Sequence, residues 1–244
     1  MEARPVRGLH AVVIGASGGL GRAFVEELAG RDDVATVAAL SRHPATFAHP
    51  KVAGGHIDLL DEAAVAAAAA ALAGRAPRLV ICAAGILHEG TLQPEKSLRD
   101  LDPARLAQVF AVNAIGPALV IKHFAPLLPR QGRSVMAALS ARVGSISDNR
   151  LGGWYAYRAS KAALNQLLRT ASIELARRQP EALVVGLHPG TVETALSAPF
   201  RSSVSADRLF TPRYAAARML AVLDGLSPRD SGRCFAWNGA EVPP

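Results

Sequence analysis

The sequence predicts an α/β fold: one domain, residues 1–244, built on a doubly wound parallel sheet of about seven strands flanked by helices. Two observations predict this fold. Short apolar runs of strand length alternate with longer helical patterns along the chain, and a glycine-rich turn joins the first apolar run to the first helical pattern. A chain of 244 residues with 50% hydrophobic content is long enough to bury one such core.

Apolar runs of strand length mark the candidate strands. They are continuous rather than alternating, which is typical of a parallel sheet covered by helices on both faces. Ligands of a doubly wound sheet lie beyond the carboxyl ends of its strands, so the residues that follow each run are the candidates for a site. The runs are Leu9–Ile14, Val34–Leu40, Val52–Ile57, Leu79–Ala83, Ser134–Leu139, Leu183–Leu187 and Cys234–Trp237.

Helical patterns fill the gaps between these runs. Asp61 can cap the alanine-rich second pattern, and alanine is the best helix former. Asp102-Pro103 gives the third pattern a capping residue followed by proline in the first turn. The predicted helices are Gly19–Ala29, Asp61–Arg75, Pro103–Leu128, Tyr155–Arg178 and Pro212–Leu226.

The formal net charge of +7 does not predict a nucleic-acid partner, because the arginines are spread singly and the tightest cluster is only Arg177-Arg178. A solvated basic surface explains the charge better. Such a surface would still attract anionic ligands, phosphorylated cofactors included, by long-range steering that salt weakens.

No stretch reaches the roughly 18 uncharged apolar residues of a membrane helix, and residues 1–8 lack the apolar run of a secretory signal. We therefore expect a cytoplasmic protein with no membrane partner. Cys82 and Cys234 lie in apolar runs and are expected in the core. The histidines have no ligand spacing such as HExxH, so no metal site is expected.

The glycine-rich turn has the pattern GxxxGxG through Gly15, Gly19 and Gly21. Glycines let the chain turn tightly and bring backbone N–H groups near a pyrophosphate, which then lies at the positive end of the following helix. The turn therefore predicts a nucleotide site. The same residues spell GxSxG around Ser17, the nucleophile elbow of α/β-hydrolases, so a serine hydrolase with His188 after a later strand is an open alternative.

Tyr157 and Lys161 are four residues apart in the fourth predicted helix, so they share one face about one turn from each other. A phenol titrates near pH ~10, and a fixed positive neighbour favours the phenolate and lowers that value. The pair therefore predicts a proton donor. Tyr155 does not fit this pattern, because Ala159 stands four residues after it.

Five motifs occur in an order that resembles the short-chain dehydrogenase/reductase family. They are the GxxxGxG turn, Cys82-Ala83-Ala84-Gly85, Asn113, Ser140 and Tyr157-x-x-x-Lys161. The resemblance covers nearly the whole chain, and it implies a Rossmann-type fold and an oxidoreductase. Ser140–Asn149 and Gly152–Tyr155 resemble the C-factor-like and carbonyl-reductase-like branch of the family.

The resemblance implies a role for each matched residue. Tyr157 is the general acid for carbonyl reduction and the general base for alcohol oxidation, while Lys161 lowers its pKa and binds the nicotinamide ribose. Ser140 holds the substrate oxygen, and Asn113 supports a water that leads protons toward Lys161. Asp58 is the adenine contact. The implied cofactor-binding residues are Gly15, Ser17, Gly18, Gly19, Leu20, Gly21, Ser41, Arg42, Asp58, Leu59, Ala83, Ala84, Gly85, Asn113, Tyr157, Lys161, Pro189, Gly190, Val192 and Thr194.

The substrate-facing serine has a rival. Ser140 lies further from Tyr157 than is usual in the family, and Ser145 in the same loop could take its place. Ser140 is favoured because it directly follows a predicted strand. His188 closes the sixth predicted strand and is interpreted as a structural histidine rather than a pocket residue.

The residues at the end of the second predicted strand indicate which nicotinamide cofactor is preferred. An acidic residue there would bind the ribose 2′-hydroxyl of NAD and repel a 2′-phosphate. The sequence instead has Ser41-Arg42, and Arg42, with Arg22, can meet a phosphate through charge-assisted hydrogen bonds. NADP(H) is therefore preferred over NAD(H). Asp32 and Asp33 could supply the acid, but they precede the strand.

The implied reaction transfers a hydride between NADP(H) and a small-molecule carbonyl or secondary alcohol. The segment Ser197–Phe210 resembles the substrate lid of the family. Helices Pro103–Leu128 and Tyr155–Arg178 pair across a two-fold axis in similar proteins, so a homodimer or homotetramer is expected. The rival hypothesis is a nucleotide-binding signalling or regulatory protein of the C-factor type with little turnover.

Overall fold

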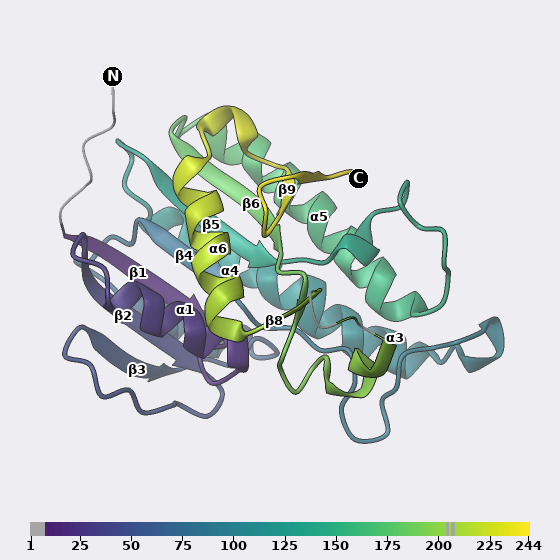
Figure 1. Ribbon diagram of the computed structural model, residues 1–244. Coiled ribbons are helices and arrows are strands. Elements are labelled where there is room, and N and C mark those ends of the chain that lie inside the picture. Colours follow the sequence, from purple (N-terminus) through teal and green to yellow (C-terminus); the bar gives the residue numbers. More distant parts are fainter. Residues whose placement is uncertain (1–7, 204, 206–207) are drawn as a thin grey trace.

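A sheet of eight strands lies at the centre of the computed structural model, which describes residues 8–203, 205 and 208–244 (Figure 1). Its order is β10-β9-β6-β5-β4-β1-β2-β3, and every neighbouring pair is parallel except β9 and β10. The strands are β1 Leu9–Ile14, β2 Val34–Ser41, β3 Val52–His56, β4 Leu79–Cys82, β5 Ser134–Leu139, β6 Ala182–His188, β9 Cys234–Ala236 and β10 Glu241–Val242. The predicted α/β fold with a parallel sheet is confirmed.

Strands β7 and β8 form a separate parallel ribbon that the sequence analysis did not find. They span Thr191–Val192 and Leu209–Phe210 and bracket the predicted lid. Strand β10 was also missed. Each of these strands has two residues, which is too short for the apolar pattern that identified the others.

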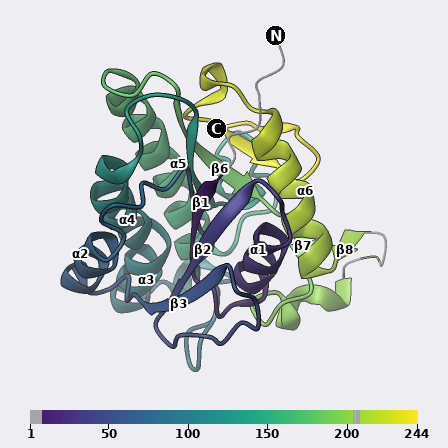
Figure 2. The same ribbon diagram turned by 90° about the vertical axis from the view of Figure 1, so that its left-hand side faces the viewer.

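Helices cover both faces of the sheet (Figure 2). On one face α1 and α6 enclose a core with Phe24, Leu28 and Met219. On the other face α2, α4 and α5 enclose a core with Phe124 and Leu164. The helices are α1 Gly19–Ala29, α2 Glu62–Ala70, α3 Pro103–Phe110, α4 Gly116–Phe124, α5 Tyr155–Ala176 and α6 Pro212–Gly225. Two buried faces explain why the strands are apolar throughout.

The predicted single helix Pro103–Leu128 is interrupted. A π-helical stretch, Ala111–Ile115, separates α3 from α4. Pro117 has no backbone N–H, so the carbonyl of Asn113 has no α-helical donor four residues on. The wider turn therefore centres on Asn113, which the sequence analysis proposed for the site.

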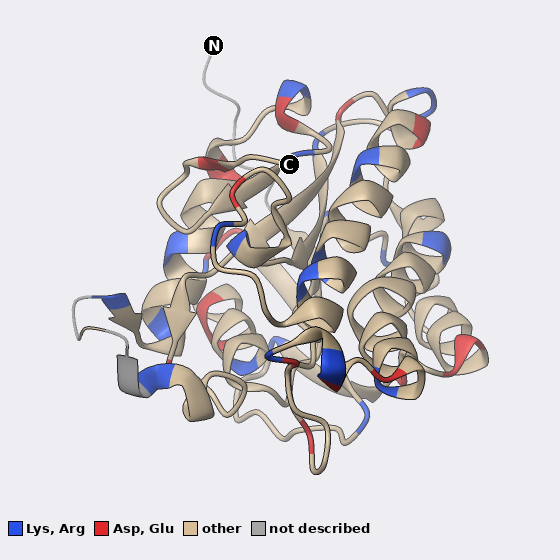
Figure 3. Ribbon diagram, turned by 90° about the vertical axis from the view of Figure 1, so that its right-hand side faces the viewer, with Lys and Arg blue, Asp and Glu red and all other residues tan. Residues whose placement is uncertain are grey.

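The chain from Pro103 to Leu127 is long and apolar enough to span a membrane by length and composition, with a mean hydropathy of 1.5 and 33% of that window buried. In the fold it packs along the sheet and α5. Basic and acidic residues are interspersed along the ribbon in Figure 3. The expectations of no membrane partner and no nucleic acid stay predictions.

Some predicted features fall on residues outside the described part of the chain. The opening residues 1–7, used for the expectation of a cytoplasmic protein, are among them. Residues 204 and 206–207 of the predicted lid also lie outside it. Cys82 and Cys234 are buried and free, as predicted.

A substitution at Gly21, in the first turn of α1, tests how tightly the glycine-rich turn packs. A Cβ atom there would lie 2.0 Å from the carbonyl oxygen of Gly15, which is backbone and cannot move aside cheaply. We expect Gly21→Ala to lower the free energy of unfolding by about 1–3 kcal/mol, as overpacking does. Thermal unfolding followed by circular dichroism measures the change.

Gly225 is the matched control, because it is also helical and a Cβ atom there would meet nothing within 4 Å. Gly225→Ala is expected to leave the free energy of unfolding unchanged or to raise it by up to about 1 kcal/mol. Equal effects of the two substitutions would contradict the tight turn.

Candidate active site

The glycine-rich turn brings three strand ends together. Gly15 has a φ of +85°, and a Cβ atom there would lie 2.8 Å from the backbone nitrogen of Ala84, after β4. A Cβ atom on Gly19 would lie 2.9 Å from Thr194 Cγ2, which follows β6 and β7. The turn, Ala84 and Thr194 were all predicted cofactor contacts, and the fold places them side by side.

The start of α1 fits a pyrophosphate. Gly18 caps the helix without a side chain, and Ser17, Gly18 and Gly19 are exposed. The backbone N–H groups of a helix N-terminus attract anions, and the residues at this N-terminus are exposed. The residues present therefore fit the phosphates of a dinucleotide.

Lys161 is the buried centre of the predicted catalytic group. Its side chain is 2% exposed, and Nζ donates a hydrogen bond to the carbonyl of Leu139, the last residue of β5, at 2.8 Å. Burial lowers the pKa of Lys161 to about 8. A Cβ atom on Gly85 would lie 3.5 Å from Nζ and 3.4 Å from Asn113 Oδ1, so the loop after β4 passes directly beside the ammonium and Asn113.

Tyr157 lies one turn before Lys161 on α5, as predicted. Lys161 Nζ is 5.7 Å from the centroid of the phenol ring. Burial raises the pKa of Tyr157 to about 12. Desolvation of the phenolate causes this rise, which is opposite in direction to the lowering by Lys161 that the sequence predicts. The role of Lys161 in activating the phenol stays a prediction.

Asn113 is locked by its side chain to the loop after β4. Oδ1 accepts from the backbone nitrogen of Ile86 at 2.8 Å, and Nδ2 donates to the Ile86 carbonyl at 2.8 Å. Nδ2 also donates to Ser160 Oγ at 3.1 Å, and Ser160 Oγ donates to the Tyr157 carbonyl at 2.8 Å. Asn113 thus ties the loop after β4 to the turn of α5 that carries Tyr157.

The sequence analysis missed Ser160, although the signal was present. Tyr157, Ser160 and Lys161 lie at i, i+3 and i+4, so they share one helix face. Ser160 is fully buried. A polar residue on the same face as the candidate acid is a positioning residue that this spacing could have found.

The Ser140 hydroxyl is engaged with α5. Oγ donates to Asn165 Oδ1 at 2.6 Å, and Asn165 lies about 12 Å further along the axis of α5 than Tyr157. Ser145 instead donates to the Pro244 carbonyl at 3.3 Å. Both serine hydroxyls thus have partners other than Tyr157 in the described part of the chain, and a contact of Ser140 with substrate stays a prediction.

The residues after β2 are arranged only partly as predicted. Ser41 is buried, and its hydroxyl donates to the His43 carbonyl at 2.9 Å, so it is already engaged. Arg42 is exposed and lies 3.9 Å from Glu89, a long ion pair that a stronger anion could displace. The guanidinium of Arg22 lies 4.7 Å over the Phe47 ring.

The remaining predicted cofactor contacts follow β3 and β6. Asp58 Oδ1 accepts from the backbone nitrogen of Leu60 at 3.0 Å. A Cβ atom on Gly116 would lie 2.8 Å from Leu59 Cβ, so Leu59 packs against α4. Gly190 has a φ of +76°, which suits glycine where the chain turns out of β6.

His188 ends β6 beside Ser140. Burial lowers its pKa to about 4, helped by the positive charge of Arg142, and Nδ1 has no hydrogen-bond partner among the described residues. No three His, Cys, Asp or Glu side chains cluster as metal ligands within the described ranges. The absence of a metal site stays a prediction.

The comparison with protein families decides which family this chain belongs to. The model of the family described as short chain dehydrogenase matches residues 9–205. The chain belongs to the short-chain dehydrogenase family. It is thus an oxidoreductase of the short-chain dehydrogenase/reductase type, and the fold is one that binds a nicotinamide cofactor.

Relatives and solved structures agree with this assignment. C-signal of Myxococcus xanthus is 40% identical over 148 residues, 60% of this chain and 83% of that protein. The 1-hydroxy-2-glutathionyl-2-methyl-3-butene dehydrogenase of a Rhodococcus species is 30% identical over 91% of this chain and 93% of that protein. The NADPH-bound carbonyl reductase from chicken fatty liver has a TM-score of 0.84 and 28% identity, covering 98% of this chain and 95% of that one.

The resemblance to the branch of C-factor-like and carbonyl-reductase-like proteins is confirmed by these matches. The family match argues against the hydrolase alternative, because the matched family is one of oxidoreductases and the matched residues include the turn around Ser17. No hydrogen bond joins Ser17 to a histidine in the described part of the chain.

His188 gives a pH-dependent prediction. Its pKa is about 4 in the folded protein and about 6.5 in an unfolded chain, so between these values the unfolded state binds more protons. Stability should therefore rise as the pH rises from 4 to 6.5, by about 2–3 kcal/mol at most. Denaturant unfolding across this range measures the slope.

His188→Gln should flatten this part of the stability profile, since glutamine does not titrate. His43→Gln, at an exposed histidine, is the control and should keep the wild-type slope. If both variants retain the slope, another group causes it.

Proposed function

We propose that this protein transfers a hydride between NADP(H) and a carbonyl or secondary alcohol, with Tyr157 as the general acid and base. The observation that carries the proposal is the position of the phenol. Tyr157 and Lys161 stand on one face of α5 at the carboxyl end of β5, with Gly85 and Asn113 beside the ammonium.

Each residue of the group has a task when the cofactor is bound. The reduced nicotinamide supplies the hydride. The glycine-rich turn holds the pyrophosphate at the N-terminus of α1, and Lys161 binds the nicotinamide ribose from beside Gly85. Asn113 fixes the loop after β4 and, because Pro117 frees its carbonyl, offers an acceptor for a water near Lys161.

We propose carbonyl reduction as the direction of the reaction. Burial raises the pKa of Tyr157 to about 12, so the phenol is protonated at neutral pH, as an unperturbed phenol also is. The alkoxide that forms when a carbonyl accepts a hydride is a stronger base than phenolate, so it takes this proton.

We propose a positioning role for Ser140 in addition to the predicted contact with the substrate oxygen. Because its proton is donated to Asn165, Ser140 holds the end of β5 against α5. The C-signal relative supports a second candidate, a nucleotide-binding signalling protein with little turnover.

We also propose that NADP(H) is preferred, because Arg42 is exposed after β2 and no acidic residue follows that strand directly. The chicken carbonyl reductase bound to NADPH supports this preference. Localisation in the cytoplasm remains part of the proposal.

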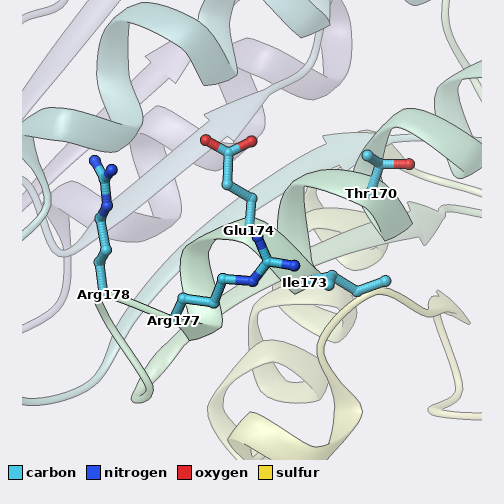
Figure 4. Close-up of a pocket in the computed structure, with 5 residues that line it drawn as sticks. All are labelled: Thr170, Ile173, Glu174, Arg177 and Arg178. Carbon is cyan, nitrogen blue, oxygen red and sulfur yellow. The ribbon is translucent and has the colours of Figure 1, made fainter.

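A homodimer or homotetramer is proposed through α4 and α5. Leu167 and Ile173 on α5 are exposed apolar residues, and so is Ile115, directly before α4. The outer face of α5 carries a shallow hollow of about 370 Å³ near its C-terminal end (Figure 4). Its lining residues are Thr170, Ile173, Glu174, Arg177 and Arg178. Light scattering of the purified protein gives its mass directly.

Tyr157→Phe tests the proposed chemistry. Loss of the acid should lower kcat for carbonyl reduction by about 10²–10⁴-fold, while the affinity for NADPH changes little. NADPH consumption with a panel of aldehydes, ketones and quinones gives kcat, and NADPH fluorescence gives the affinity. Tyr155→Phe, one half-turn away, is the control and should retain activity. Unchanged turnover in Tyr157→Phe, or tight NADPH binding without turnover in the wild type, favours the signalling candidate.

Arg42→Ala tests the cofactor preference. Removing a charge-assisted hydrogen bond to the 2′-phosphate costs about 1.5–3 kcal/mol, so KM for NADPH should rise about 10–100-fold. KM for NADH should change less than about 3-fold. Arg75→Ala, at an exposed arginine after α2, is the control for lost surface charge. An equal effect on both cofactors would show that Arg42 does not meet the phosphate.

A further inference from the structure

Trp154 has an unusual backbone. Among the described residues it is the one non-glycine residue in the left-handed region, with φ 52° and ψ 45°. Gly152 and Gly153, directly before it, also have positive φ. A bulky residue in this conformation is strained and persists only where its surroundings hold it, which is most often at functional sites.

Glu95 holds this turn in place. Its backbone carbonyl accepts a hydrogen bond from the Trp154 nitrogen at 2.6 Å, and its carboxylate Oε2 accepts from the Ala156 nitrogen at 3.1 Å. Glu95 is 3% exposed, although glutamate is seldom buried. The buried Glu95 carboxylate accepts a hydrogen bond from the first turn of α5 and therefore fixes the start of the helix that carries Tyr157.

The Trp154 ring lies between the candidate acid and the lid. Its centroid is 6.2 Å from that of Tyr157, with the planes at 81°, and 4.9 Å from that of Phe200. Phe200 in turn lies 5.8 Å from the His88 ring. The four rings form a continuous aromatic row, Tyr157-Trp154-Phe200-His88.

Three separate segments supply this row at the ligand-binding end of the sheet. His88 follows β4, Phe200 belongs to the 3₁₀ turn Ala198–Ser203 after β6, and Trp154 and Tyr157 begin α5. His88 Nε2 lies 3.2 and 3.1 Å from the carbonyl oxygens of Ala195 and Leu196, which joins the loop after β4 to the residues directly before the lid. Loops after parallel strands form the substrate side of such folds.

From this arrangement we propose that Trp154 and Phe200 determine substrate specificity, and that the substrate carries an aromatic ring next to its carbonyl. The ring packs edge-to-face against the Trp154 indole while the carbonyl oxygen reaches the Tyr157 hydroxyl. Aromatic rings at 4.5–7 Å prefer this geometry, and the strained turn holds the indole in position before the substrate arrives. The proposal rests on the function proposed above and names its substrate class.

Trp154→Asn tests the proposal, because asparagine tolerates the left-handed backbone while the indole is removed. The variant is compared with the wild type on benzaldehyde, cyclohexanecarbaldehyde and propanal, with NADPH consumption as the measurement. We expect kcat/KM for benzaldehyde to fall about tenfold or more, mainly through KM, and kcat/KM for propanal to change less than about threefold. Trp154→Phe keeps an aromatic ring and should restore most of the benzaldehyde activity.

Cyclohexanecarbaldehyde, the saturated counterpart of benzaldehyde, separates the effect of an aromatic contact from the effect of substrate size. Wild-type kcat/KM should be higher for benzaldehyde than for cyclohexanecarbaldehyde, and Trp154→Asn should remove that difference. Phe200→Leu, on a different segment, should also reduce the preference for benzaldehyde, so the test does not depend on the folding of one variant.

Equal losses on benzaldehyde and propanal would show that Trp154 only supports the fold, and this specificity proposal would be overturned while the proposed oxidoreductase function stands. A wild-type protein that binds NADPH but reduces none of the three aldehydes, nor any member of the wider carbonyl panel, would overturn both proposals.

Discussion

A buried ammonium at the end of a buried strand is the constraint on which the candidate site depends. Lys161 is 2% exposed and satisfies its charge with the carbonyl of Leu139 at 2.8 Å, the last acceptor of β5. A buried ammonium without such a partner would be very costly, so the contact fixes α5 against the end of the sheet. The same contact sets the position of Tyr157 one helical turn earlier, and it places the ammonium beside Gly85, where we propose that the ribose binds.

The surrounding structure supports this constraint from two directions. The π-helical turn places Asn113 where it binds both polar groups of Ile86 and reaches Ser160, so the loop after β4 and α5 are held together. At the start of α5, Glu95 caps a strained turn at Trp154. Hydrogen bonds from Asn113 and Glu95 thus position the start of α5. The rings of Trp154 and Tyr157 lie at the same end of the helix, and Trp154 contacts Phe200 of the predicted lid.

The sequence predicted the sheet, the main helices and the positions of Tyr157 and Lys161, because apolar runs and helical spacing are local signals. It did not predict the π-helical turn at Asn113. That turn depends on Pro117, four residues later, which has no backbone N–H to donate to the Asn113 carbonyl. The sequence also did not predict the burial that raises the phenol pKa, because the amount of burial around Tyr157 is set by segments distant in the chain. The hydrogen bond of the Ser140 hydroxyl depends on Asn165, which belongs to α5. The backbone conformation of Trp154 depends on its hydrogen bond to Glu95. Neither contact could be inferred from spacing in the sequence.

Isotope transfer tests the central claim most directly, namely that Lys161 and the glycine-rich turn hold a nicotinamide within hydride reach of an oxygen at Tyr157. The wild-type protein is given NADPH carrying two deuterium atoms at C4 and a carbonyl substrate that it consumes, and the alcohol is analysed by mass spectrometry. The account predicts one deuterium on the carbinol carbon of the product. A product alcohol without deuterium, or with deuterium only when the solvent is D₂O, would contradict it.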